Sequence, residues 1–141
     1  MYKKTITYTD YNDKERTEDF YFSLNEAELT EMQASTPGGY NNMIQKMIDS
    51  QDVNTLISVI KDLVVKSYGV KSDDGRRFIK KPELTEEFLQ TPAYSKFYTS
   101  LITNEKEMSN FINNILPADL MAKVEKAKVE NLTANSTPSG T

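Results

Sequence analysis

Cysteine and histidine are both absent from this chain of 141 residues. Their absence excludes metal sites built on thiolate or imidazole ligands, and it excludes Cys-His and Ser-His-Asp nucleophilic machinery. No disulfide can form, which is compatible with a reducing cytoplasm. No other catalytic set is recognisable, so we expect a protein that is not an enzyme and that uses no cofactor and no metal.

Long apolar runs and an excess of positive charge are also lacking. No apolar run approaches the roughly 20 residues of a membrane span, and MYKKTITYTD has no apolar core of a signal peptide. The formal net charge of -4 argues against general nucleic-acid binding, which depends on neutralising phosphates. We therefore expect a small soluble domain that has neither a membrane nor a nucleic acid as its partner.

The first segment with a clear pattern is a β-hairpin. Residues 2 to 9 alternate, with Tyr2, Ile6 and Tyr8 on one face, and residues 15 to 22 form a second strand. Residues 10 to 13, DYND, weakly resemble a calcium loop, but they are more typical of a hairpin turn because the glycine and the final glutamate are missing. A lone hairpin is marginal in water, so it should pack on helices or pair its open edge with another chain.

A helical body is predicted after the hairpin. Ser23-Leu24-Asn25-Glu26 is predicted as a capping box for a helix to about Ala34, and Asp52 as the cap of a central apolar helix over 53–68. The stripe of that helix consists of Leu56, Ile57, Ile60, Leu63 and Val64, broadened by Val59. Shorter helices are expected around 43–48, from Thr85 to Leu89, after Thr91-Pro92, after Asn104 with Glu107, and from Pro117.

The expected fold is therefore α+β, an N-terminal β-hairpin followed by a compact bundle of about six short helices. We expect one globular domain over residues 1–130, with the hairpin at 1–23 and the helical body at 24–130. Residues 131–141 contain almost nothing to bury, which predicts a disordered tail.

A charged turn follows the central helix. Gly69 is expected to close that helix in a left-handed conformation, Asp74-Gly75 to form a tight turn, and Pro82 to delay the next helix. Five cations fall within eleven residues here: Lys71, Arg76, Arg77, Lys80 and Lys81. They can pair with nearby carboxylates, contact an acidic protein or bind phosphate. Carboxylates close by are Asp73, Asp74, Glu83, Glu86 and Glu87, but charged turns are usually solvated, so a catalytic role is disfavoured.

The residues predicted to bind a partner come from this turn and from the short helix before the central one. They are Arg76, Arg77, Phe78, Lys80, Met43 and Met47. Methionines form adaptable binding surfaces, although at helical spacing beside isoleucines they are more often part of a core.

Three segments carry a resemblance to a known family: YKKTITYTDYNDKERTEDFYFSLNEAELTEM, SYGVKSDDGRRFIKKPELTEEFLQTPAYS and FINNILP. They resemble small tail-morphogenesis proteins of long-tailed phages of Gram-positive bacteria, which look like tail assembly chaperones. The similarity runs from Tyr2 to about Pro117, and DGRRFIK with PEL is its most specific part.

This resemblance implies binding to the helical tape measure protein and assistance to tail tube assembly, in the host cytoplasm and without retention in the mature virion. It implies no catalytic residue. A helical body suits the capture of an amphipathic helix in an apolar groove, and the hairpin edge suits self-association or pairing with a tube strand.

Two other classes stay open at this point. One is a virion structural protein, such as a tail connector or completion factor, whose hairpin would join a permanent ring. The other is a small nucleic-acid-binding regulator that acts through Lys71 to Lys81.

Overall fold

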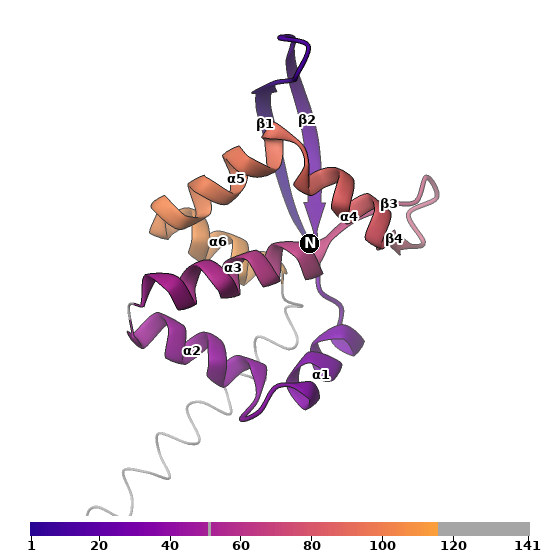
Figure 1. The fold of residues 1–141 in the computed structure, drawn as a ribbon. Coiled ribbons are helices and arrows are strands. Elements are labelled where there is room, and N and C mark those ends of the chain that lie inside the picture. The colour runs from indigo at the N-terminus through magenta and orange to yellow at the C-terminus, as the bar shows by residue number, and fades with distance from the viewer. Residues whose placement is uncertain (51, 116–141) are drawn as a thin grey trace, which may run out of the picture.

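The structure, a computed structural model, describes residues 1–50 and 52–115 (Figure 1). Two long strands come first, β1 (Tyr2–Thr9) and β2 (Glu15–Phe22), followed by α1 (Glu26–Ser35), α2 (Tyr40–Ser50) and α3 (Val53–Ser67). Two short strands follow, β3 (Tyr68–Lys71) and β4 (Phe78–Ile79), and then α4 (Pro82–Leu89), α5 (Pro92–Thr103) and α6 (Glu105–Ile115). This confirms the α+β class with an N-terminal hairpin and six helices in the described residues.

The four strands form one antiparallel sheet in the order β1-β2-β3-β4. β1 and β2 pair over their whole length, from Tyr2 opposite Phe22 to Thr9 opposite Glu15. β3 pairs with β2 only at Tyr21 and Phe22, so the outer part of the hairpin projects beyond the helices as a two-stranded arm (Figure 1).

The residues 10–13 form the predicted hairpin turn. The Asp10 carboxylate accepts hydrogen bonds from the N–H groups of Asn12 (2.8 Å) and Lys14 (3.0 Å), and it pairs with Arg16 at 2.6 Å. The Arg16 guanidinium, followed by the Lys14 N–H, lowers the pKa of Asp10 below its usual value. Asp13 takes the left-handed conformation with φ of 62°, as aspartate tolerates in turns.

The core is an aromatic cluster between the base of the hairpin and the helices. Phe22 is completely buried, and its ring centroid lies 4.9 Å from that of Phe97 in α5 and 5.6 Å from that of Phe111 in α6. Tyr68 stacks on Phe88 of α4 at 4.3 Å. These contacts are why the hairpin is stable here although it would be marginal alone.

Helix α3 is central, as its apolar stripe predicts. It contacts α5 on one side and α2 on the other (Figure 1), and its buried residues are Val59, Ile60, Leu63, Val64 and Ser67. Asp52 is the N-cap, accepting from the Asn54 N–H at 3.0 Å, which confirms the predicted start. Ile57 is an exception to the stripe, since 37% of it is exposed.

The predicted capping box at residues 23–26 is wrong by two residues. The N-cap of α1 is Asn25, whose side chain accepts from the Glu28 N–H (2.8 Å), while the Glu28 carboxylate accepts from the Asn25 N–H (3.0 Å). Ser23 is excluded from this role because its N–H donates to the Ser67 carbonyl at 2.8 Å, which holds it beside the end of α3.

The prediction that Gly69 closes the central helix is also wrong. α3 ends at Ser67, and Gly69 lies in strand β3 opposite Tyr21. Asp74-Gly75 does form the tight turn, with φ of 73° at Gly75, but that turn joins β3 to β4 in a second hairpin. The next helix begins at Pro82 rather than at Thr85, because proline is well suited to the first turn of a helix, where its missing N–H costs nothing.

The start of α5 agrees with its sequence signal, since Thr91 caps this helix by accepting from the Tyr94 N–H (3.2 Å). At α6 the capping box expected from Asn104 and Glu107 is only half formed. Asn104 accepts from the Glu107 N–H (3.1 Å), but its own N–H donates to the Ser100 carbonyl (2.9 Å), and the Glu107 carboxylate pairs with Lys4 (2.6 Å). The helix expected from Pro117, the domain limit at residue 130 and the tail at 131–141 lie outside the described residues and stay predictions.

We expect Leu63→Ala to lower the free energy of unfolding by about 2 to 5 kcal/mol, because Leu63 is fully buried and its removal leaves a cavity. Thermal or urea unfolding measures the loss. Ile57→Ala on the same helix is the control and should cost far less, since Ile57 is partly exposed. Equal effects of the two changes would contradict this description of α3.

We expect Gly69→Ala to destabilise the fold by about 1 to 3 kcal/mol through overpacking. A Cβ atom on Gly69 would lie 2.6 Å from the ring of Phe78, so space rather than backbone conformation requires glycine here. In a Phe78→Ala background the same change should cost much less, which a double-mutant cycle measures. An equal cost in both backgrounds would exclude the ring as the cause.

Candidate protein-binding surfaces

The basic turn, residues 71–81, is held in shape by its own hydrogen bonds. The Asp74 carboxylate accepts from Ser72 Oγ (2.7 Å) and from the Arg76 N–H (3.0 Å), and the Arg77 N–H donates to Ser72 Oγ (3.0 Å). The Ser72 hydroxyl is the main cause of a lowered pKa at Asp74. The turn therefore presents its cations from a defined backbone.

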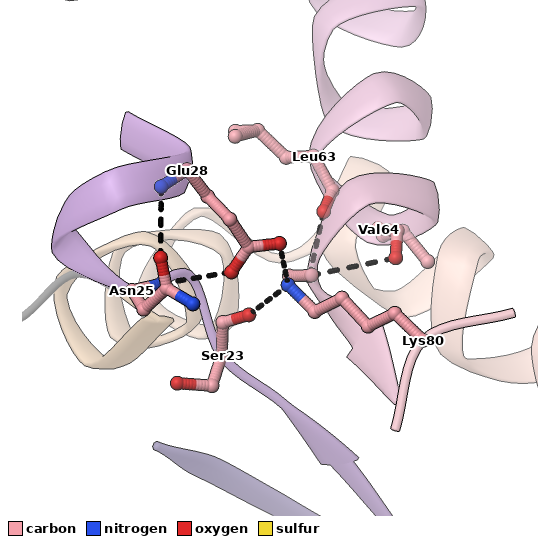
Figure 2. A network of polar contacts seen from close by, with 7 residues as sticks. Ser23, Asn25, Glu28, Leu63, Val64 and Lys80 are labelled. Carbon is pink, nitrogen blue, oxygen red and sulfur yellow. Dashed lines mark hydrogen bonds and ion pairs between the residues drawn. The ribbon is translucent and has the colours of Figure 1, made fainter. Parts of the chain in front are cut away.

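Lys80 is the cation of this turn that has a structural role. Its ammonium donates to the Glu28 carboxylate (2.6 Å) and to the Ser23 carbonyl (2.7 Å), as Figure 2 shows. Since Glu28 also completes the capping box of α1, Lys80 connects the second hairpin to the start of that helix. The prediction that Lys80 contacts a partner stays untested, and this arrangement favours an internal role.

The other cations are placed differently. Lys71 lies over the ring of Tyr21, with its ammonium 4.4 Å from the ring centroid. Arg76, Arg77 and Lys81 are exposed and form no ion pair with any residue of the described chain. Intramolecular pairing, one of the roles considered for this turn, thus applies to Lys80 and leaves these three side chains available to an acidic partner.

Phe78, another predicted contact residue, lies on the sheet rather than on a free surface. Its ring covers the backbone of Gly69, and the Lys80 ammonium lies 5.7 Å from its centroid. The ring is partly buried, so only its outer edge can reach a partner.

The predicted methionines do not join the basic turn. Met43 lies on α2 and packs, partly buried, against the hydrophobic core. The side chain of Met47 is outside the part of the structure that is described. In Figure 1, α2 and the β3–β4 turn lie on opposite sides of the helical body, so the six predicted residues form two separate sets.

An apolar groove that the sequence did not indicate lies between α1 and α2. It has a volume of about 350 Å³ and is lined by Leu29, Thr30, Gln33, Ala34, Tyr40 and Asn41. The hydroxyl of Tyr40, one of these lining residues, donates to Asp62 (2.8 Å), which pairs with Lys66 at 2.9 Å. Burial, and then the bond to Asp62, raise the pKa of Tyr40 far above its usual value, so this hydroxyl stays protonated.

The arm of the hairpin is the third surface. Tyr11 at its tip is 83% exposed, and β2 is exposed from Glu15 to Asp19. The Tyr8 hydroxyl donates to Glu18, which is the main cause of a pKa of about 12 at Tyr8. Among the described residues, no strand other than β2 pairs with β1, and none other than β1 pairs with β2 from Glu15 to Phe20, so the arm has two open strand edges.

Two negative findings apply to the described residues. Within 1–50 and 52–115, no group of three or more aspartates and glutamates is arranged to hold a metal ion. Within the same ranges, no helix is both long enough and apolar enough to cross a membrane.

The comparison with protein families decides the class. A family model described as phage tail assembly chaperone matches residues 1–140. The chain belongs to the phage tail assembly chaperone family. No curated protein and no solved structure matches it. The match covers almost the whole chain, including both hairpins and the α1–α2 groove, so these surfaces belong to the family's domain.

Membership of the chaperone family confirms the resemblance that the DGRRFIK and PEL motifs carry. It implies that the protein has partners among the proteins of tail assembly. It favours this class over a nucleic-acid-binding regulator.

We expect Lys80→Ala to lower the free energy of unfolding by about 1 to 3 kcal/mol, because it removes two bonds of a charged donor and leaves Ser23 and Glu28 without it. Chemical denaturation measures this loss. The double change Arg76→Glu and Arg77→Glu should shift stability by no more than about 0.5 kcal/mol, as for exposed positions without partners. A large loss from the arginine pair would show that the turn depends on them.

Proposed function

We propose that this protein is a tail assembly chaperone that binds a helical segment of its phage's tape measure protein in the host cytoplasm and assists the assembly of tail tube subunits around it. The protein then leaves and is absent from the mature virion. The observation that carries this proposal is the family match over residues 1–140. The absence of a recognisable catalytic set in the sequence is consistent with a role in binding alone.

The groove between α1 and α2 is the surface best suited to such a helix. It offers Leu29, Ala34 and the Tyr40 ring as apolar wall, and Gln33 and Asn41 as polar rim. An amphipathic helix buries its apolar face in a groove of this kind, with side chains at i, i+3 or i+4 and i+7 as anchors. Met43, on the same helix as Tyr40, supplies adaptable packing behind it.

A second contact of the proposed complex involves three cations of the basic turn, which would contact acidic residues of the partner. They are Arg76, Arg77 and Lys81. They are exposed, and the acidic protein around them makes a nucleic acid an unfavourable ligand. Charges at the rim of an interface mainly raise the rate of association and set its orientation. These three cations therefore orient the partner, while the groove holds it.

Co-expression with the tape measure protein tests the proposal. We expect the wild-type chain to keep the tape measure protein soluble and to co-purify with it, because covering apolar helices removes an aggregation surface. Ala34→Arg should abolish co-purification, since Ala34 is exposed and lines the groove. Ala27→Arg is the matched control, because Ala27 is exposed on the same helix and does not line the groove.

Ala34→Arg and Ala27→Arg should both unfold at the temperature of the wild type, which separates loss of binding from loss of fold. A tape measure protein that stays insoluble with the wild type, together with this chain found in stoichiometric amounts in purified virions, would contradict the proposal. That outcome would support a structural protein of the tail instead.

A further inference from the structure

The outer edge of β1 carries backbone groups that β2 does not use. The Asp10 N–H donates to the Lys14 carbonyl (2.8 Å), which sets the alternation of the ladder. In an antiparallel pair every second residue bonds its partner strand, so the even-numbered residues of β1 face β2 and the odd-numbered ones face away. The N–H and C=O groups of Thr5, Thr7 and Thr9 therefore point outward.

A contact from α5 supports this alternation independently. The ammonium of Lys96 donates to the carbonyl of Thr7, which it reaches from the outer side of the strand. Lys96 forms no ion pair with any described residue. Lys96 thus bonds the Thr7 carbonyl, which lies in the middle of the open edge of β1.

The two edges of the arm differ in charge. On β2 the outward-facing residues are Glu15, Thr17 and Asp19, and carboxylates on an edge strand oppose pairing with another copy. On β1 the corresponding residues are Thr5, Thr7 and Thr9, which are uncharged and β-branched. Such residues favour strand pairing. The one charged group bonded to this β1 edge is the ammonium of Lys96, at the Thr7 carbonyl, among the described residues.

The outer side of β1 is hollowed where it faces α5. Two hollows lie along it, one of about 250 Å³ lined by Thr5, Ile6, Thr7, Ser100 and Lys96 among others, and one of about 560 Å³ lined by Thr9, Tyr11, Ser95, Thr99 and Lys96 among others. Lys96 lines both hollows, and its ammonium bonds the Thr7 carbonyl.

We propose that β1 of one copy pairs in antiparallel fashion with β1 of a second copy, with Thr7 opposite Thr7, and that Lys96 is the latch that opposes this pairing. The strand is self-complementary in this register. Thr5 then lies opposite Thr9 on one face, and Ile6 lies opposite Tyr8 on the other. No like charges face each other between residues 5 and 9. The pairing joins two four-stranded sheets into one continuous sheet.

The short contact makes this a reversible, concentration-dependent dimer, because a strand of this length buries less surface than a stable dimer does. Two-fold symmetry closes the assembly, since each copy uses its only uncharged arm edge. This pairing involves only β1 and its surroundings, so it is independent of tape measure binding.

Disulfide trapping tests the register directly, since the natural chain has no cysteine. Residues that exchange backbone bonds across an antiparallel pair have Cα atoms about 5.5 Å apart, within the range that a disulfide spans. Thr7→Cys should therefore give a covalent dimer under mild oxidation. Thr17→Cys is the matched control, because Thr17 lies directly opposite Thr7 on the same face, with the two hydroxyls 2.9 Å apart.

Sedimentation or light scattering provides a second test, in which the molar mass of proteins without cysteine is measured as a function of concentration. The average molar mass of the wild type should rise with protein concentration. Lys96→Ala should lower the dimer dissociation constant severalfold, because the Lys96 ammonium no longer competes for the Thr7 carbonyl. Thr7→Pro should remain monomeric, since it removes an outward N–H and no bond of the β1–β2 ladder. Thr17→Pro makes the same change on β2 and should behave as the wild type.

Monomers at every concentration for both the wild type and Lys96→Ala, together with no Thr7→Cys dimer, would overturn the proposal. Faster cross-linking of Thr17→Cys than of Thr7→Cys would also overturn it, because that result places the contact on β2. Circular dichroism on each variant separates loss of association from loss of the hairpin.

Discussion

The contacts of the Phe22 ring hold the separate parts of this fold together. Phe22 is the last residue of β2, and its ring lies within 6.2 Å, centroid to centroid, of the rings of Tyr2, Tyr68, Phe88, Phe97 and Phe111. Those residues come from β1, β3, α4, α5 and α6. A buried aromatic side chain contributes both a large apolar area and specific edge-to-face contacts. The base of the hairpin is therefore part of the core, and this is what allows its outer half to project as an arm.

The helices α1 and α2 are attached to this core by different means. The Leu24 N–H donates to the Ile115 carbonyl (2.9 Å), and Lys80 binds Glu28 and the Ser23 carbonyl. The start of α1 is thus held from two sides, by the end of α6 and by Lys80, whose two bonds are drawn in Figure 2. Such a support fixes one wall of the α1–α2 groove, so the partner helix proposed above would meet a preformed surface, and less ordering entropy would oppose its binding.

How well each part could be predicted follows from how far apart in sequence its contacts are. The first hairpin, the Asp52 cap and the Thr91-Pro92 start depend on neighbouring residues, and the structure confirms them. β4 is only two residues long and exists because β3 first pairs with β2, about fifty positions earlier in the chain. Local sequence signals therefore predict a helix end at Gly69, whereas the close approach of the Phe78 ring is the reason for that glycine.

The candidate surfaces also divide into those set by neighbouring residues and those set by contacts distant in sequence. The exposure of Arg76 and Arg77 follows from a turn that sequence reasoning placed correctly, but the pairing of Lys80 with a glutamate 52 positions away has no local signal. The α1–α2 groove has none either, since it arises from the packing of two helices. Figure 1 shows these helices and the hairpin arm at opposite ends of the molecule. Pairing through β1 would thus leave both grooves of a dimer accessible, so a two-fold assembly could hold two segments of one long helical partner and gain affinity by avidity.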